Sequence, residues 1–202
     1  MSAVVTNIND LDLVNGIYRY ADYLMWKFQE RVELLKGKIF KMAAPSPVHQ
    51  EISGILFVSF FSYFKNKKCK VYHAPFDVRI PRRNEKDEEI LTVLQPDICV
   101  ICDPEKIDSR GCLGAPDLVV EILSPGNSQK ELDNKFRIYE EAGVAEYWIV
   151  DPEHEAVWVN VLKEGQYVIQ KPVAMGKTVT SVKFPDLEIS TAEVFAKKVM
   201  NC

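Results

Sequence analysis

Residues 116–123, P-D-L-V-V-E-I-L, are the segment that most restricts the fold of this chain. A short run of apolar and β-branched residues bounded by prolines is typical of a fully buried strand. Glu121 nevertheless lies inside that run. Burying a carboxylate is costly unless it pairs with another charge or binds a metal ion. The segment therefore predicts a buried strand, and it requires a partner for Glu121.

The elements around this strand indicate a mixed α/β fold. The predicted core runs, in chain order, through helix 48–66, strands 69–80, 96–102 and 116–123, helix 128–142, and a strand within 146–152. Apolar residues four apart (Ile52, Leu56, Phe60, Phe64) predict that the first helix faces the core. We expect a single domain over 1–202, with a helical N-terminal extension over 1–31. A C-terminal hairpin and tail over 155–202 would turn at Glu164-Gly165.

Charge and hydropathy favour a cytoplasmic protein without a membrane anchor. No apolar run reaches the roughly 18 residues of a membrane helix, and no signal peptide is apparent at the N-terminus. The net charge of −4 does not point to a nucleic-acid partner, although it leaves room for a local basic groove. Two basic clusters are interpreted as a solvated turn and a strand end: Lys65, Lys67, Lys68 and Lys70, and Arg79, Arg82 and Arg83.

The cysteines give no sign of a metal site or of a disulfide framework. There are five, an odd number without secretory context, so we expect reduced thiols. The pair C-V-I-C at 99–102 lies in an apolar strand, where Cys99 and Cys102 would point to opposite faces. Because no second pair completes a four-ligand set, we do not expect zinc.

Spacing along the strands identifies a partner for Glu121. Asp117 shares its face but lies four residues away, about 13 Å along a strand. Two carboxylate oxygens on one Mg²⁺ lie only about 3–4 Å apart, so Asp117 is a poor second ligand. Asp97 opens the preceding strand and can face Glu121 across the sheet. Alone, Asp97 would be read as a turn-capping residue. Beside a buried Glu121, it predicts a site for Mg²⁺ or Mn²⁺.

A lysine is the remaining group that such a site would use. Leu123 stands two residues beyond Glu121 on the same face, where a lysine could act directly. The next candidates, Lys130 and Lys135, lie on the following helix. Lys135 borders the apolar stripe of that helix and could extend its ammonium over the sheet edge. A solvated lysine paired with Glu131 is the alternative.

Several stretches together resemble a known family. They are V-E-L-L-K-G (32–37), S-P-V-H-Q (46–50), Q-P-D (95–97), G-A-P-D-L-V-V-E-I-L-S-P (114–125), Lys135 with Tyr139, and A-G-V-A-E-Y-W-I-V-D-P (142–152). The family is that of the putative restriction endonucleases, once catalogued as a domain of unknown function, in the PD-(D/E)xK nuclease superfamily. The resemblance implies a restriction-endonuclease-like core of helix, three strands, helix and strand.

The resemblance also implies an activity and its residues. The protein would be a Mg²⁺-dependent endonuclease that cleaves DNA, with Asp97 and Glu121 as metal ligands and Lys135 as the displaced lysine. His49 would contact phosphate or order the site, or serve only as a capped structural residue. Glu33 lies in a matching block, with a catalytic or a structural role.

Two other readings remain open at this point. The protein could be a nuclease-like module that binds DNA or a protein without cleavage, as Leu123 and the acidic pI would suggest. It could also hydrolyse another phosphorylated substrate. Since duplex cleavage commonly needs two active sites, the nuclease hypothesis favours a homodimer.

Overall fold

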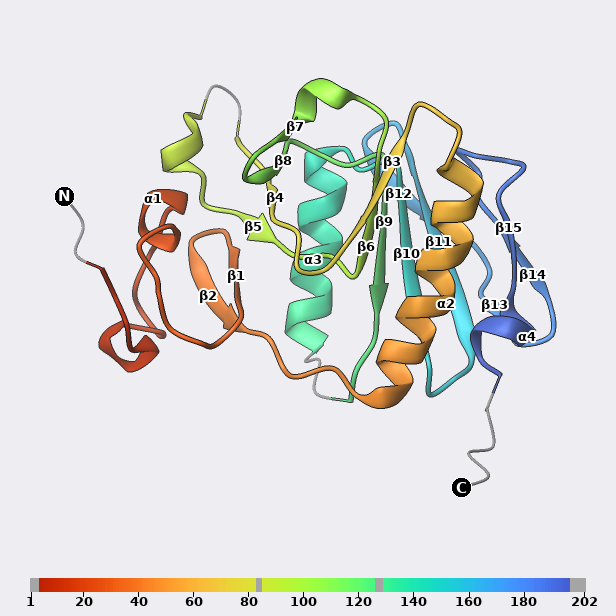
Figure 1. Ribbon diagram of the computed structural model, residues 1–202, viewed down its shortest axis with the longest axis horizontal. Coiled ribbons are helices and arrows are strands. Elements are labelled where there is room, and N and C mark those ends of the chain that lie inside the picture. The colour runs from red at the N-terminus through yellow and green to blue at the C-terminus, as the bar shows by residue number, and fades with distance from the viewer. Residues whose placement is uncertain (1–3, 83–84, 126–128, 197–202) are drawn as a thin grey trace.

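The computed structural model describes residues 4–82, 85–125 and 129–196, and its centre is a seven-stranded mixed sheet (Figure 1). In spatial order this large sheet contains β12 (Gln166–Ile169), β11 (Ala156–Lys163), β10 (Glu146–Asp151), β9 (Leu118–Ile122), β6 (Ile98–Ile101) and β3 (Lys70–His73), with β13 (Val173–Ala174) paired to β11. Strands β9 and β10 are parallel, and the other pairs are antiparallel. The helix between β9 and β10 is the crossover that a parallel pair requires.

Two long helices cover opposite faces of the large sheet (Figure 1). Helix α2 (Pro47–Phe64) packs Ile52, Leu56, Phe60 and Phe64 on one face, together with Leu118, Val120 and Ile122 of β9. Helix α3 (Gln129–Ala142) covers the other face, where Ile138 and Tyr139 contact the core around Val119. Because side chains alternate along β9, Glu121 points to the α3 side of the sheet.

A smaller sheet closes the α3 side of the molecule. Its six strands lie in the order β2 (Lys38–Lys41), β1 (Val32–Leu35), β5 (Val93–Leu94), β4 (Val78–Arg79), β8 (Gly111–Leu113) and β7 (Ile107–Asp108). Leu35, Val78, Leu94 and Cys112 join the same buried cluster as α3 and Val119. The space between the two sheets is therefore a packed core, and it holds the buried part of the candidate site.

The C-terminal elements extend the core on the α2 side. Strands β14 (Thr178–Thr180) and β15 (Glu188–Ser190) form a two-stranded sheet followed by α4 (Thr191–Val194). Glu146 at the start of β10 is fully buried and accepts hydrogen bonds from Trp148 Nε1 (2.6 Å), Ser181 Oγ (2.9 Å) and the Lys183 backbone N–H (2.8 Å). This carboxylate fixes the C-terminal segment to the large sheet.

None of the helices in the described residues is both long enough and apolar enough to span a bilayer.

The mixed α/β fold is confirmed, and most of the predicted elements are present. The hairpin of β11 and β12 turns at Glu164 (φ 50°) and Gly165 (φ 80°), as expected from the sequence. The prediction of one strand over 69–80 is wrong. The chain leaves the large sheet after His73 and enters the small sheet at Val78, because Pro75 lacks the N–H that a continuous ladder needs.

The N-terminal segment is less helical than we expected. Among its described residues, only η1 (Ile8–Asp10) and α1 (Tyr20–Tyr23) are helical. Its aromatic residues instead pack on the small sheet, where Tyr20 joins Leu34, Ile90 and Val93. The aromatic residues of this segment lie at irregular spacing, which does not produce the single apolar stripe of a helix.

The sequence suggested that Arg79 belongs to a solvated basic strand end, and for Arg79 this interpretation is wrong. Its side chain is fully buried, and its guanidinium contacts Asp87 Oδ1 and Asp108 Oδ2, each at 2.6 Å. Asp87 belongs to the charged segment that precedes β5, in the 3₁₀ helix η2 (Asp87–Glu89). The buried guanidinium of Arg79 therefore holds the charged segment around η2 in place. Arg83, of the same predicted cluster, lies outside the described residues.

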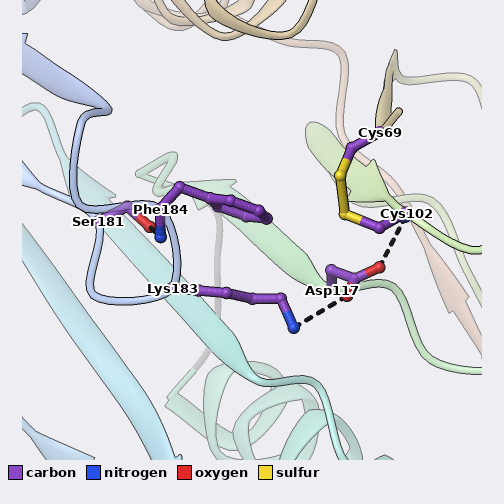
Figure 2. Close-up of a disulfide and its surroundings, with 6 residues drawn as sticks. All are labelled: Cys69, Cys102, Asp117, Ser181, Lys183 and Phe184. Atoms are coloured by element: carbon purple, nitrogen blue, oxygen red, sulfur yellow. Dashed lines mark hydrogen bonds and ion pairs between the residues drawn. A yellow bond between two sulfur atoms is a disulfide. The ribbon is translucent and has the colours of Figure 1, made fainter. Parts of the chain in front are cut away.

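Two of the five cysteines form a disulfide, so the expectation of reduced thiols is wrong for them (Figure 2). Continuing the β3–β6 register by one residue sets Cys69 opposite Cys102. The two strands therefore place the sulfurs within bonding distance, which the sequence alone does not reveal. Cys99 and Cys112 are free and buried, and Cys202 lies outside the described residues. As expected, Cys99 and Cys102 contribute to the cores on opposite faces of the sheet.

Candidate functional site

Glu121 meets a lysine and a tyrosine of helix α3. Lys135 Nζ donates a hydrogen bond to Glu121 Oε1 at 3.0 Å, and Tyr139 OH donates to the same oxygen at 2.7 Å. Lys135 and Tyr139 are one helical turn apart, so both side chains lie on the face of α3 that covers β9. The glutamate that looked misplaced in a buried strand is thus paired and hydrogen-bonded.

Glu33 on β1 completes this buried group of charges from the small sheet. Its Oε2 lies 2.9 Å from Lys135 Nζ, and its Oε1 accepts the backbone N–H of Gln95 at 2.7 Å. Glu33 is 1% exposed and Lys135 5%, so one buried ammonium is shared by two buried carboxylates. Lys135 therefore joins three elements, β1, β9 and α3, at one atom.

Asp97 lies at the edge of the same group. The β6–β9 register pairs Ile98 with Val120, and one further step sets Asp97 opposite Glu121. Asp97 Oδ2 accepts the Ile122 backbone N–H at 2.7 Å and contacts His49 Nε2 at 3.2 Å. The facing of Asp97 and Glu121 that the sequence predicted thus follows from the observed register.

His49 enters the site from the first turn of α2. Ser46 caps that helix by accepting the His49 backbone N–H at 3.2 Å, and Pro47 occupies the first turn. The cap fixes where the helix begins and so directs the imidazole to Asp97. Its Nδ1 is buried and has no hydrogen-bond partner within the described residues. His49 therefore touches a proposed site residue through its ring, beyond any role in capping.

A pocket of about 160 Å³ opens onto these groups. Its ionisable lining residues are Arg31, Glu33, Lys41, His49, His73, Asp97, Glu121, Glu131 and Lys135. The pocket is mainly polar in character and brings cationic groups around the two facing carboxylates. Such a mixture suits a ligand that carries negative charge and binds together with a metal ion.

Burial and charge set the ionisation of the site. Burial raises the pKa of Glu121 to about 7, against the opposing effect of Lys135. Burial opposes the charge of Lys135, but Glu121 and Glu33 outweigh it and hold the pKa of that ammonium above its usual value. Burial likewise opposes a charge on His49, and the hydrogen bond to Asp97 raises the pKa of the imidazole nonetheless.

The structure brings together all five candidate residues from the sequence: Asp97, Glu121, Lys135, His49 and Glu33. Between the two candidate lysines, Lys135 reaches Glu121, whereas Lys130 is exposed on α3. Asp117 binds the Cys102 N–H (2.7 Å) and Lys183 (2.9 Å) at the other end of β9 (Figure 2). Its exclusion as a partner of Glu121 agrees with this position.

Sequence reasoning missed the residues that support the site. Gln95 is held by Asp77 Oδ1 (2.8 Å) and Tyr23 OH (3.1 Å), and its own Oε1 accepts from Arg31 NH2 at 2.8 Å. Gln95 precedes Pro96 and Asp97 in a stretch that the resemblance already marked, which was its only signal. Tyr139 was named with Lys135 in the resemblance, without a role, and it follows Lys135 by one helical turn.

The donor set fits a hard divalent cation bound largely by water and substrate. No cluster of three or more His, Cys, Asp or Glu side chains placed to hold a metal occurs in the described parts of the chain. Asp97 and Glu121 each use one oxygen in the bonds above. Asp97 Oδ1 and Glu121 Oε2 accept no hydrogen bond from the described residues. Mg²⁺ is commonly bound by one or two carboxylates together with waters and phosphate oxygens.

Comparison with known proteins agrees with this architecture. The chain is 31% identical over 120 residues to the uncharacterized protein slr1290 of Synechocystis sp., covering 58% of this chain and 60% of the relative's length. A putative nuclease belonging to DUF820 from Anabaena variabilis superposes with a TM-score of 0.68, covering 88% of this chain and 97% of that one. At 21% identity this likeness is one of fold.

The sequence model of one family matches residues 20–192, which include every candidate site residue. That range contains all three described sheets and both long helices. The chain therefore belongs to the Uma2 family, which is described as "Putative restriction endonuclease".

Proposed function

We propose that this protein is a metal-dependent endonuclease that hydrolyses phosphodiester bonds in DNA. The observation that carries the proposal is the constellation of Asp97, Glu121 and Lys135 in one pocket. Two carboxylates face one another across neighbouring strands, and a lysine is bonded to one of them. Membership of the Uma2 family supports the same class of chemistry.

In this proposal Asp97 and Glu121 hold Mg²⁺ or Mn²⁺ through the oxygens that they do not use within the protein. When bound, such an ion would neutralise phosphate charge and lower the pKa of a coordinated water. The Ile122 N–H and His49 fix the Asp97 carboxylate, so that its other oxygen keeps one direction. Tyr139 and Lys135 orient Glu121 in the same way.

Lys135 supplies a positioned cation. An ammonium has three N–H donors, and Glu33 and Glu121 accept two of them. The third is left to donate to a phosphate oxygen or to an attacking water in the pocket. Glu33 then acts as a positioning residue, because it holds the ammonium at the place that Leu123 leaves without a cation.

Arg31 is suited to contact the DNA backbone beside the cleaved bond. It is exposed at the pocket and has no carboxylate partner within the described residues. One guanidinium nitrogen is held by Gln95, and the others remain available for a phosphate oxygen. Lys41 and His73, on the same pocket, add to a local basic lining in a protein of net charge −4.

The test is cleavage of supercoiled and linear plasmid DNA with Mg²⁺ or Mn²⁺. We expect Asp97→Asn, Glu121→Gln and Lys135→Met each to reduce cleavage at least about a hundredfold, the order of effect of removing a group that stabilises a transition state. Glu188→Gln, an exposed carboxylate on β15, and Lys130→Met, an exposed lysine on α3, serve as matched controls and should cleave like the wild type.

Cleavage that survives the substitutions at Asp97 and Glu121 would overturn the assignment. If the wild type does not cleave but binds DNA, the protein is a nuclease-like binding module. Metal binding is followed separately by the rise in melting temperature on adding Mn²⁺, which the Asp97→Asn variant should lose.

A further inference from the structure

Helix α2 carries an apolar face that is turned away from the rest of the described structure. Its buried stripe faces the large sheet, but its opposite side also has large apolar residues. Val58 is 62% exposed and Phe61 48% exposed. A helix that is apolar on both sides is expected to be covered on both sides. The C-terminal segment covers only part of α2: α4 contacts the helix, whereas Val58 and Phe61 stay exposed.

The charges on this face are arranged symmetrically about Val58. Glu51 lies seven residues before Val58 and Lys65 seven residues after it, so each is about 10 Å away along the helix. All three lie on the same side of α2, because seven residues are close to two full turns. Within the described residues, neither Glu51 nor Lys65 has an ion-pair partner.

We propose that this face binds a second copy of the chain, with the two α2 helices antiparallel and a twofold axis passing through Val58. A twofold axis there sets Glu51 of each copy against Lys65 of the other, which forms two identical ion pairs. Antiparallel pairing of identical helices is self-complementary only when opposite charges lie at equal distances from the axis, as they do here. This charge complementarity selects a second copy as the occupant.

The shape of the face suits the same arrangement. A Cβ added at Gly54 would meet no atom within 4 Å, so this glycine leaves open space on the surface of α2. Gly54 lies four residues before Val58 and Phe61 three residues after it. The twofold axis therefore brings Phe61 of one copy over Gly54 of the other. A large residue then fills the space that a small one leaves.

A neighbouring groove enlarges the surface beyond a single helix. It has a volume of about 430 Å³ and is lined by apolar residues of α2 and the C-terminal segment, among them Val48, Ile55, Pro152, Val194 and Phe195. A stable dimer buries about 800 Å² on each partner. One helical face alone is too narrow for that area, and the adjoining groove supplies additional apolar surface.

The oligomeric state of the full chain tests the proposal, without DNA or metal. Light scattering after size exclusion should give twice the chain mass of 23.1 kDa for the wild type. Val58→Lys would place two like charges together at the axis, and we expect it to give monomers. Ile169→Lys is the matched control, because Ile169 is equally exposed (63%) on β12 and should leave the dimer intact.

Charge exchange provides a sharper test of the symmetry. Glu51→Lys or Lys65→Glu alone should weaken the dimer roughly tenfold, since each converts two attractive pairs into two repulsive ones. Both substitutions in one chain restore the pairs, and so does mixing the two single variants. Recovery of dimers by the double substitution within one chain is expected only for an antiparallel pairing that sets residue 51 of each copy opposite residue 65 of the other.

A monomeric wild type at all concentrations would overturn the inference, as would a dimer that Val58→Lys leaves unchanged. Circular dichroism shows whether each variant is folded. Because the measurement needs neither catalysis nor a metal ion, its result is independent of the proposed nuclease activity.

Discussion

At the scale of single residues, one ammonium shared by two carboxylates governs the chemistry of the pocket. Lys135 balances one negative charge, so Glu33 and Glu121 together leave one in excess. The excess falls on a group whose burial raises its pKa to about 7. Without a metal ion, burial therefore disfavours the charged form of Glu121. The binding of a cation would favour its charged form.

We expect the uncompensated negative charge on Glu121 to make the stability of the folded protein depend on pH. The folded pKa of Glu121, about 7, lies above the usual value of 4.5, so the folded state holds the proton more tightly than the unfolded state does. The contribution of protonated Glu121 to stability is fully present below the pKa of the unfolded state. It is lost as the pH rises through the pKa of the folded state. In the presence of a chelator, the free energy of unfolding should fall between pH 5 and pH 8, by at most about 3 kcal/mol from this group.

Glu121→Gln provides the comparison, because a glutamine there keeps an oxygen acceptor for Lys135 and Tyr139 without the charge. Urea denaturation at both pH values measures the difference. The variant should lose less stability than the wild type as the pH rises. Parallel curves for the two proteins would show that Glu121 titrates normally in the fold.

At the scale of elements, a buried carboxylate holds the C-terminal segment in place. Glu146 accepts hydrogen bonds from Trp148, Ser181 and the Lys183 backbone, and so connects β10 with the segment between β14 and β15. The segment also packs Phe184 against Phe64 of α2, with ring centroids 4.9 Å apart. Polar and apolar contacts thus act on the same short connection.

Glu146→Ala should therefore loosen this connection. It would leave three donors without their acceptor, and we expect the protein to lose about 3 kcal/mol of stability. Hydrogen exchange of the β14 and β15 amides should become faster than that of β9. Glu188→Ala, on the exposed side of β15, is the control and should change neither quantity. Equal acceleration throughout the chain would indicate global unfolding instead.

The sequence predicted the elements whose signals are local. The α2 stripe, the cap at Ser46 and the turn at Glu164-Gly165 each depend on residues close in the chain, and each is present. The small sheet was largely missed, because β4, β5, β7 and β8 have only two or three residues each. Strands this short have no readable alternation, and their pairing is set by distant partners.

The residues of the candidate site also divide into those with a local sequence signal and those whose position depends on distant partners. Asp97 and Glu121 were predictable because a carboxylate in or beside an apolar strand is conspicuous. The role of Glu33 could not be predicted, since its contact with Lys135 depends on how the small sheet packs on α3. The disulfide of Cys69 and Cys102 was hidden for a similar reason: their proximity results from the register of two strands.

At the scale of the whole molecule, the proposed nuclease would have to bind a polyanion with a net charge of −4 of its own. Few cationic side chains are then available to contact phosphates, so the loss of any one of them should measurably weaken DNA binding. We expect Arg31→Ala to weaken DNA binding and to lower the slope of log K against log salt by about one. Fluorescence anisotropy in the Glu121→Gln background, which should not cleave, measures both quantities.

Arg137→Ala is the control for this prediction, because Arg137 is an exposed arginine on α3 away from the pocket. It should bind DNA with the salt slope of the parent protein. An unchanged salt slope in Arg31→Ala would show that Arg31 does not contact DNA. That result would not bear on the proposed metal site.

The position of Lys135 has a consequence for when the proposed nuclease could be active in a cell. Its ammonium is aligned only when Glu33 of the small sheet and Glu121 of the large sheet are both in place. A newly made or partly denatured chain whose small sheet has separated would keep Asp97 and Glu121 but lose this alignment. If the protein is the nuclease we propose, DNA cleavage would thus be confined to completely folded molecules, because only these hold the ammonium in place.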